Sequence, residues 1–153
     1  MPNTYSQLYV QIIFAVQGRK HFINENIREE VQMYMAGIIE AKQQKLFAIY
    51  CMPDHTHIFL SQQPNICVSD ITRDIKANSS NWIKNRFSFL ETFSWQEGFG
   101  AFSYSKSQAP KVVNYVLNQK EHHKKKTFKQ EYLGFLKAFD VEYDTRYLFE
   151  FYE

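Results

Sequence analysis

The segment 46–61, LFAIYCMPDHTHIFLS, decides the fold that we expect for this chain. Two runs rich in β-branched and aromatic residues, Leu46–Met52 and His55–Ser61, lie on either side of the turn-forming pair Pro53-Asp54. The pattern predicts two strands joined by a tight turn. Because alternate residues of a strand point to the same face, His55 and His57 are expected side by side on the second strand.

The neighbouring segments extend this hairpin into a complete α+β pattern. Upstream, residues 5–16 alternate like a strand, and residues 27–44 have helical spacing after a capping Asn24 or Asn26. Downstream, a helix begins at Ser69 or Asp70, and a strand covers residues 101–105. The order β-α-β-β-α-β predicts a ferredoxin-like sandwich, an antiparallel sheet with helices on one face.

Further helices follow this pattern. Ser107 is predicted to cap a third helix that carries Pro110 in its first turn and runs to about Lys124. Thr127 caps a fourth, which ends before Asp140. The second face of the sheet must be covered by these helices, by a partner or by a ligand. Without repeats or linker-like segments, residues 1–153 are expected to form a single domain.

Composition narrows the class of protein only in part. Lys and Arg exceed Asp and Glu by two (18 − 16), so no overall field demands a polyanionic partner. Cys51 and Cys67 form no CxxC motif and are predicted to be buried free thiols of a reducing compartment. We find no signal peptide and no apolar run of membrane-spanning length, so a cytoplasmic protein is expected.

The histidine pair is the first candidate site. Two imidazoles on one face can bind a divalent cation, although an HxH on a half-exposed strand, taken alone, is more often structural. The predicted third helix adds Tyr115 and Gln119, which are four residues apart and therefore share a face. The oxygen of Gln119 suits Mg²⁺ or Mn²⁺. We therefore predict His55, His57 and Gln119 as metal ligands, with Tyr115 as a nucleophile beside them.

This arrangement suits phosphoryl transfer. A phenol has a pKa near ~10 and is a poor nucleophile at neutral pH. A nearby cation is expected to depress that pKa and to stabilise the transition state at a phosphate. Attack gives a covalent phosphotyrosine that conserves the energy of the broken bond, and a 3′-hydroxyl can later attack it. Such strand transfer needs no nucleotide cofactor.

Three motifs in this order resemble one known family. They are MPDHTHIF (52–59), WQEGFGAFS (95–103) and YVLNQKEHH (115–123). Together they resemble the single-tyrosine HUH transposases, small insertion-sequence enzymes that act on single-stranded DNA, and their relatives that act on repetitive palindromic elements. The resemblance covers nearly the whole chain. Thr56 departs from the hydrophobic residue usual in the HUH motif, but it is expected to face away from the ligands.

The resemblance implies a function in some detail. It implies that His55 and His57 bind the metal, that Gln119 completes the metal site, and that Tyr115 is the nucleophile. It implies a transposase that nicks and rejoins single-stranded DNA at hairpin-marked element ends through a 5′-phosphotyrosine. It also implies a homodimer in a bacterial or archaeal cytoplasm, associated with the nucleoid during its action.

Several alternatives stay open at this point. His123 competes with Gln119 as third ligand, His122 is rotated away from the same stripe, and His21 receives no role. Five basic residues are candidates for DNA contacts: Arg73, Lys76, Lys106, Lys124 and Lys125. Two other functions compete with the transposase. One is a non-catalytic domain that binds single-stranded nucleic acid, and the other is a metal hydrolase in which Tyr115 is dispensable.

Overall fold

The computed structural model describes residues 3–152 and contains one four-stranded antiparallel sheet. Its strands lie in the order β2-β3-β1-β4. Their bounds are β1 Tyr9–Ala15, β2 Lys45–Cys51, β3 His55–Ser61 and β4 Gly100–Tyr104. The element order and the pairing confirm the predicted ferredoxin-like sandwich.

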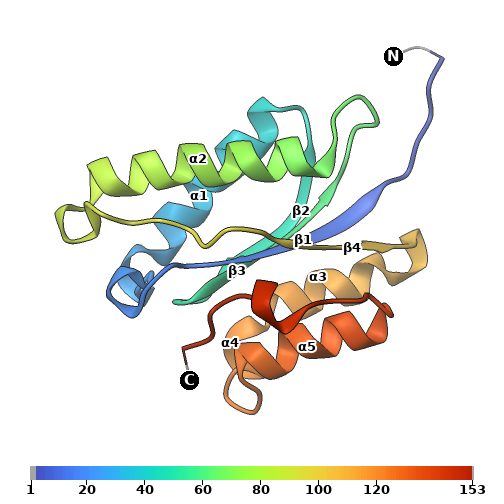
Figure 1. Cartoon of the computed structure of the whole chain (residues 1–153). Coiled ribbons are helices and arrows are strands. Elements are labelled where there is room, and N and C mark those ends of the chain that lie inside the picture. The colour runs from blue at the N-terminus through green and yellow to red at the C-terminus, as the bar shows by residue number, and fades with distance from the viewer. Residues whose placement is uncertain (1–2, 153) are drawn as a thin grey trace.

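Two long helices cover one face of the sheet, α1 (Glu25–Ala41) and α2 (Val68–Arg86) (Figure 1). Asn24 caps α1 by accepting the backbone N–H groups of Asn26 and Ile27. The main core lies between this layer and the sheet, where the period-two residues of β1 meet the helical stripes. Its fully buried members include Ile12, Phe14, Val31, Met35, Ile39, Ile58, Leu60, Ile71 and Ile75.

The later helices cover the opposite face: α3 (Ala109–Leu117), α4 (Gln119–His122) and α5 (Phe128–Ala138) (Figure 1). A second, smaller core forms there from Ala48, Phe59, Val112 and Val116. Thr127 caps α5 as predicted, in a capping box with Gln130. The chain therefore covers the second face of its sheet with its own helices.

The prediction of one continuous third helix is wrong. A 3-10 turn, η3 (Lys106–Gln108), comes first, and its capping box uses Ser105 rather than Ser107. The α-helical hydrogen bonding then ends at Leu117, and Asn118 has φ −99° and ψ 21° before α4 begins. After α4 the chain turns instead of continuing as helix to Lys124.

Smaller differences concern boundaries and exposure. β1 begins at Tyr9 and not at residue 5, since Leu8 is 40% exposed and lies outside the sheet. α2 begins at Val68, one residue before the predicted Ser69. Cys51 is buried as predicted, whereas Cys67 precedes α2 at an exposed position.

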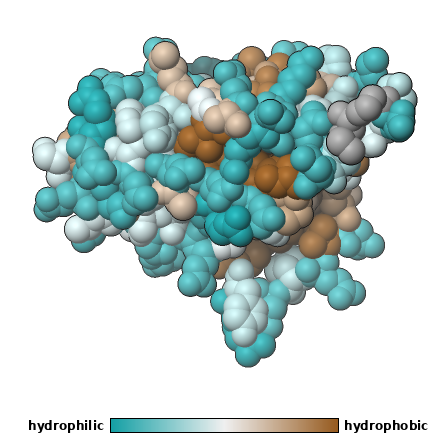
Figure 2. All heavy atoms as spheres, turned by 90° about the horizontal axis from the view of Figure 1, so that it is seen from above, coloured by the Kyte–Doolittle hydropathy of each residue, from teal (hydrophilic) through white to brown (hydrophobic). Residues whose placement is uncertain are grey.

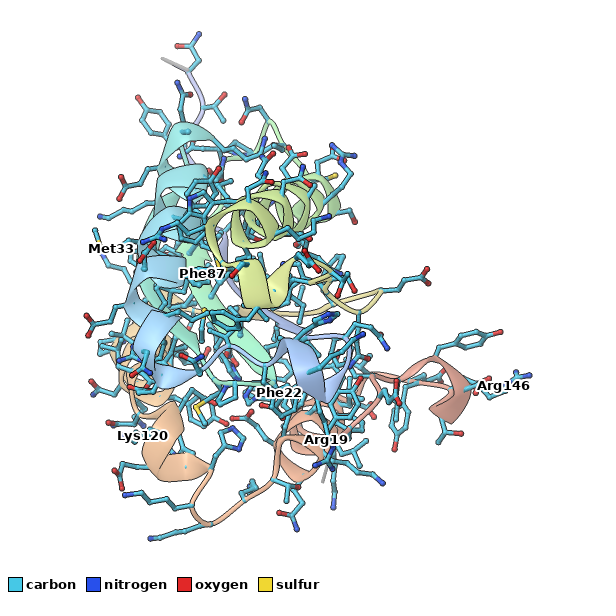
Figure 3. The ribbon with its side chains drawn as sticks, turned by 90° about the vertical axis from the view of Figure 1, so that its left-hand side faces the viewer. Arg19, Phe22, Met33, Phe87, Lys120 and Arg146 are labelled. Carbon is cyan, nitrogen blue, oxygen red and sulfur yellow. The ribbon has the colours of Figure 1, made fainter. Side chains whose placement is uncertain are left out.

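The remaining segments are short turns and the tail. Three further 3-10 turns are η1 (Arg19–His21), η2 (Ser88–Leu90) and η4 (Thr145–Tyr147). The tail carries Arg146 away from the body of the molecule (Figure 3). It then returns to the core, where Phe149 is buried. The outer surface of the α1/α2 layer is mostly hydrophilic, with a few hydrophobic patches (Figure 2). Within residues 3–152, no helix is long and apolar enough to span a membrane.

Candidate active site

Side chains alternate between the two faces of the sheet along β3, which determines which of them meet the helices α3, α4 and α5. His55 and His57 are both fully buried on the face covered by α3, α4 and α5. Thr56 points to the other face, where its hydroxyl donates to the sulfur of Cys51 at 3.3 Å. The placement agrees with the expectation that Thr56 affects core packing and not the site.

Each strand histidine is oriented by an acceptor on its Nδ1 atom. His55 Nδ1 donates to Asp54 Oδ1 at 2.7 Å, and His57 Nδ1 donates to Gln11 Oε1 at 2.7 Å. The amide nitrogen of Gln11 in turn donates to the hydroxyl of Tyr104, which fixes the Gln11 oxygen toward His57. These acceptors keep the protons on Nδ1 and leave both Nε2 atoms for the interior of the site.

His123 is held in the same way from outside β3. It follows α4, and its Nδ1 donates to the backbone oxygen of Lys126 at 2.8 Å. Its ring lies edge to face with the ring of His55, with 4.7 Å between centroids. The turn after α4 therefore places a third Nε2 atom beside the strand pair.

The three Nε2 atoms converge on a single carboxylate oxygen. Glu131 Oε1 lies 3.4 Å from His55 Nε2, 3.0 Å from His57 Nε2 and 3.2 Å from His123 Nε2. The Gln119 Oε1 atom joins them, at 3.4 Å from His55 Nε2 and 3.0 Å from His123 Nε2. The ligand atoms of the three histidines and Glu131 all lie within 4.8 Å of one another.

This donor set fits a divalent cation. Since acceptors hold the Nδ1 protons, a neutral imidazole here directs a lone pair from Nε2 toward the oxygens of Glu131 and Gln119. Lone pairs that face lone pairs repel one another unless a proton or a cation lies among them. Imidazole nitrogens oriented by outer acceptors, with a carboxylate and an amide oxygen, are typical of metal centres in proteins.

The charges of the group are strongly coupled. Burial alone would lower the pKa of His55, but hydrogen bonds to Asp54 and Glu131 raise it to about 9. For Glu131, burial alone would raise the pKa. The charge of His57 and hydrogen bonds from His123 and His55 instead hold it far below its ordinary value. Glu131 is thus an anion surrounded by imidazoles. His57 differs from His55, because its burial lowers its pKa.

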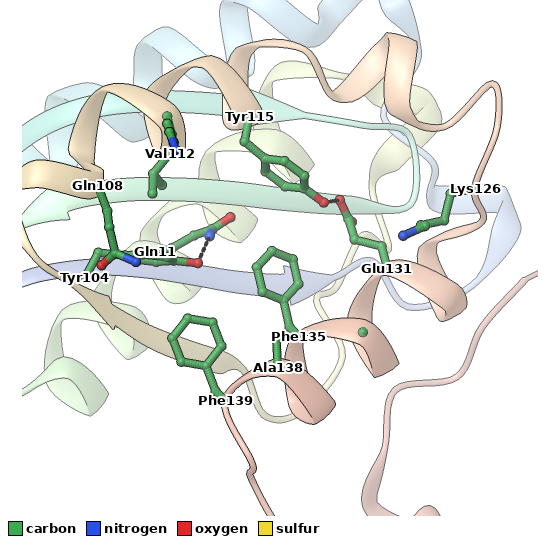
Figure 4. Close-up of a pocket in the computed structure, with 12 residues that line it drawn as sticks. Gln11, Tyr104, Gln108, Val112, Tyr115, Lys126, Glu131, Phe135, Ala138 and Phe139 are labelled. Carbon is green, nitrogen blue, oxygen red and sulfur yellow. Dashed lines mark hydrogen bonds between the residues drawn. The ribbon is translucent and has the colours of Figure 1, made fainter.

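Tyr115 reaches the same carboxylate from α3. Its hydroxyl donates to Glu131 Oε2, the oxygen that is not shared by the three histidines (Figure 4). The phenol ring stacks on His122, with centroids 4.4 Å apart. Burial and the negative charge of Glu131 raise the pKa of the Tyr115 phenol well above its ordinary value. The candidate nucleophile and the candidate metal site therefore belong to one chain and share one side chain.

The predicted site residues are brought together, with additions. His55, His57, Gln119 and Tyr115 all meet here, and His123 takes part beside Gln119 rather than instead of it. His122 stays outside the donor set, as expected. His21 has a structural setting, between the backbone oxygen of Gln17 and the hydroxyl of Thr92.

Glu131 is the residue that sequence reasoning missed. It lies on α5 between Phe128 and Phe135, at helical spacing from both, so it occupies the apolar stripe of that helix. A carboxylate in such a stripe is rarely buried without a partner. The place of Glu131 in the apolar stripe of α5 is the sequence signal that could have identified it as a site residue.

The five basic candidates for DNA contacts fall on different faces. Arg73 pairs with Asp70 and Asp74 on α2, where Lys76 also donates to the backbone oxygens of Gln96 and Gly98. This is the face opposite to the histidines. Near the site, Lys124 pairs with Glu121, and Lys125 borders a hollow beside Tyr115. Lys106 is exposed in η3, which precedes α3.

Comparisons with known proteins concern the family and the fold of the chain. The family model described as "Transposase IS200 like" matches residues 4–119. A solved structure from Deinococcus radiodurans R1, assigned as a transposase, is 19% identical with a TM-score of 0.63, over 76% of this chain and 94% of that chain. A REP-associated tyrosine transposase, solved with a bound REP hairpin, is 14% identical with a TM-score of 0.59. The match covers 79% of this chain and 72% of that chain. A search of curated proteins gives no match.

Proposed function

Since this chain belongs to the family of IS200-like transposases, we propose that it cuts and rejoins single-stranded DNA through a 5′-phosphotyrosine on Tyr115. One observation carries the proposal. The Tyr115 hydroxyl donates to one oxygen of Glu131, while the other oxygen lies within 3.4 Å of three histidine Nε2 atoms. The candidate nucleophile, its hydrogen-bond acceptor and the candidate metal ligands thus form one continuous group.

The chemistry follows from these positions. The Tyr115 oxygen attacks the phosphorus and releases its proton to water, the bond to the 3′-oxygen breaks, and that oxygen takes a proton from water. The new phosphotyrosine keeps the 5′ end of the cut strand. In the second step a 3′-hydroxyl releases its proton to water and attacks the same phosphorus, the bond to the Tyr115 oxygen breaks, and that oxygen takes a proton from water. No energy source is consumed, because one phosphodiester is exchanged for another.

Glu131 also explains why a cation is needed. With its anion beside the phenol, ionisation of Tyr115 is strongly disfavoured. A divalent cation among the imidazoles would offset the charge of Glu131, lower the phenol pKa and stabilise the charge that develops on the phosphate. His55, His57, His123 and Glu131 would hold it, with Gln119 as a further oxygen ligand. Three imidazoles favour Mn²⁺ over Mg²⁺, which prefers oxygen ligands.

We further propose that the DNA substrate carries a hairpin next to the cut. The REP-associated relative was solved with a REP hairpin. In this chain the turn after α4 places Lys125 and Lys126 around a hollow bordered by Tyr115. Cations there can hold phosphates of a strand that leads into the site.

The test is formation of a covalent adduct. Labelled single-stranded oligonucleotides with a hairpin and randomised flanks are incubated with the protein and Mn²⁺, then separated in SDS. An SDS-stable adduct is expected, and it should be lost in Tyr115→Phe and in His57→Ala. Tyr147→Phe, an exposed tyrosine in η4, is the matched control. An adduct that persists in Tyr115→Phe would exclude Tyr115 as nucleophile. Cleavage without an adduct would indicate a hydrolase, and binding without cleavage a non-catalytic domain.

A further inference from the structure

A cavity of about 420 Å³ opens beside the phenol of Tyr115, between α3 and α5 (Figure 4). Val112 of α3 and Phe135 of α5 border it on opposite sides. Its remaining walls come from the sheet, where Gln11 of β1 and Tyr104 of β4 lie under the two helices. The cavity thus leads from the surface directly to the candidate nucleophile.

The lining is mainly flat and apolar. Phe139 lies edge to face with Tyr104 at 5.4 Å, and Phe135 is stacked on Phe102 at 5.2 Å. Phe139 also packs on Phe102 at 4.9 Å, yet the residue remains 38% exposed. Two lysines, Lys111 and Lys126, belong to the rim. Aromatic walls with cations at the rim match the chemistry of a nucleotide, a flat base joined to a phosphate.

We propose that this cavity receives one unpaired nucleobase of the DNA strand, that of the nucleotide adjoining the phosphate attacked by Tyr115. The inference rests on the proposed function, because Tyr115 and Glu131 lie among the residues that line the cavity. A phosphate in contact with the Tyr115 hydroxyl has its neighbouring nucleotide within one backbone step of the cavity. Taking that base out of the strand stacks it on protein rings and fixes the phosphate for attack in line.

Gly134 offers a way to close the cavity without disturbing the fold. It borders the cavity on α5, and a Cβ atom placed there would meet no atom within 4 Å. Gly134→Leu can therefore extend a side chain over the cavity and also favours the helix. Gly37→Leu is the matched control, because Gly37 is also an exposed helical glycine with no atom within 4 Å of its Cβ. Gly37 lies on α1, across the sheet.

The experiment has two steps. First, the SDS-stable adducts of the wild-type protein with hairpin oligonucleotides in Mn²⁺ identify the cut phosphate. Second, 2-aminopurine replaces each base near that phosphate in turn, and its fluorescence is titrated with protein. We expect quenching at one position that adjoins the cut. Gly134→Leu should weaken this quenched complex roughly tenfold or more, the scale of one lost base stack, whereas Gly37→Leu should bind like the wild type.

A second pair of variants protects the test against misfolding. Phe139→Ala removes an outward-facing ring of the cavity, and Phe89→Ala removes a ring that is 59% exposed in η2. Only the first should reduce quenching. If adducts form but no base is quenched, or if Gly134→Leu and Phe139→Ala both quench like the wild type, the base cavity is wrong and the transposase activity stands. If no oligonucleotide gives an adduct, both proposals fail.

Discussion

The two oxygens of Glu131 face different neighbours, three histidine Nε2 atoms on one side and the Tyr115 hydroxyl on the other. A neutral side chain of the same size keeps the shape of this contact but removes the charge. For Glu131→Gln we therefore expect Mn²⁺ affinity to fall by at least about tenfold, with a slower rate of adduct formation. Calorimetric titration measures the affinity without relying on activity.

Glu121→Gln is the matched control for this change. Glu121 lies on α4 near the same turn, but its carboxylate is exposed and pairs with Lys124. The Mn²⁺ affinity of the Glu121→Gln protein should equal that of the wild type. Equal affinity in Glu131→Gln as well would remove Glu131 from the metal site.

A second prediction at this scale concerns pH. The metal-free pKa of His55 is raised to about 9, so at pH 7 this imidazole carries a proton that must leave before Nε2 can bind a cation. Mn²⁺ affinity should therefore rise with pH between 6.5 and 8.5, by up to about tenfold per unit if one proton is released. Calorimetry in buffers of different ionisation enthalpy counts that proton.

Asp54→Asn tests the cause of the pH dependence. It removes one of the two anions that raise the pKa of His55. The slope of affinity against pH should then become shallower in the same range. An unchanged slope would assign the released proton to another group.

At the scale of elements, α5 is the helix that delivers Glu131, and its first turn depends on a capping box. Thr127 accepts the backbone N–H of Gln130, whose side chain accepts the backbone N–H of Thr127. Thr127→Ala should lower the free energy of unfolding by about 1 kcal/mol. Urea denaturation measures it, with the exposed Thr145→Ala as control. A loss of the same size in Thr145→Ala would mean that the cap contributes nothing specific.

The elements also show what sequence reasoning can and cannot reach. Alternation along β3 predicted correctly that His55 and His57 share one face of the sheet and that Thr56 points to the other, since this follows from strand geometry alone. The break at Asn118 left no trace in the sequence, because no proline or glycine marks it and local propensity permits a continuous helix. His123 lies at the C-terminal cap of α4, one turn after Gln119, and the turn that follows supplies the Lys126 oxygen that orients its ring.

Glu131 was missed for a different reason. It is 76 residues from His55 along the chain (131 − 55), and only the docking of α5 on the second face of the sheet brings the two together. The family match also ends at Gln119, before His123 and Glu131. Long-range contacts of this kind follow from tertiary packing, which periodicity does not specify.

On the scale of the whole molecule, the site is assembled within one chain. Tyr115 and the histidines meet in cis through Glu131. We expect a mixture of Tyr115→Phe and His57→Ala proteins to form no adduct, even if the protein is a homodimer, because neither chain has a complete site. SDS gels of the mixed proteins with hairpin DNA provide the measurement. Adduct formation by the mixture would show instead that Tyr115 acts in the partner's site.

The tail adds a consequence for how the molecule can be inactivated. The ring of Phe128 is stacked on His55 at 3.9 Å, and Phe149 and Phe151 pack against Phe128 from the other end of the chain. Residues 140–147, which join α5 to these rings, are exposed throughout. A cut in this connection would leave Phe149 and Phe151 held only by non-covalent contacts, such as the hydrogen bonds between Gln96 and Glu150, while the candidate ligands and Tyr115 stay on the larger fragment. The candidate site therefore rests, through Phe128, on two rings that the chain reaches only over an exposed connection.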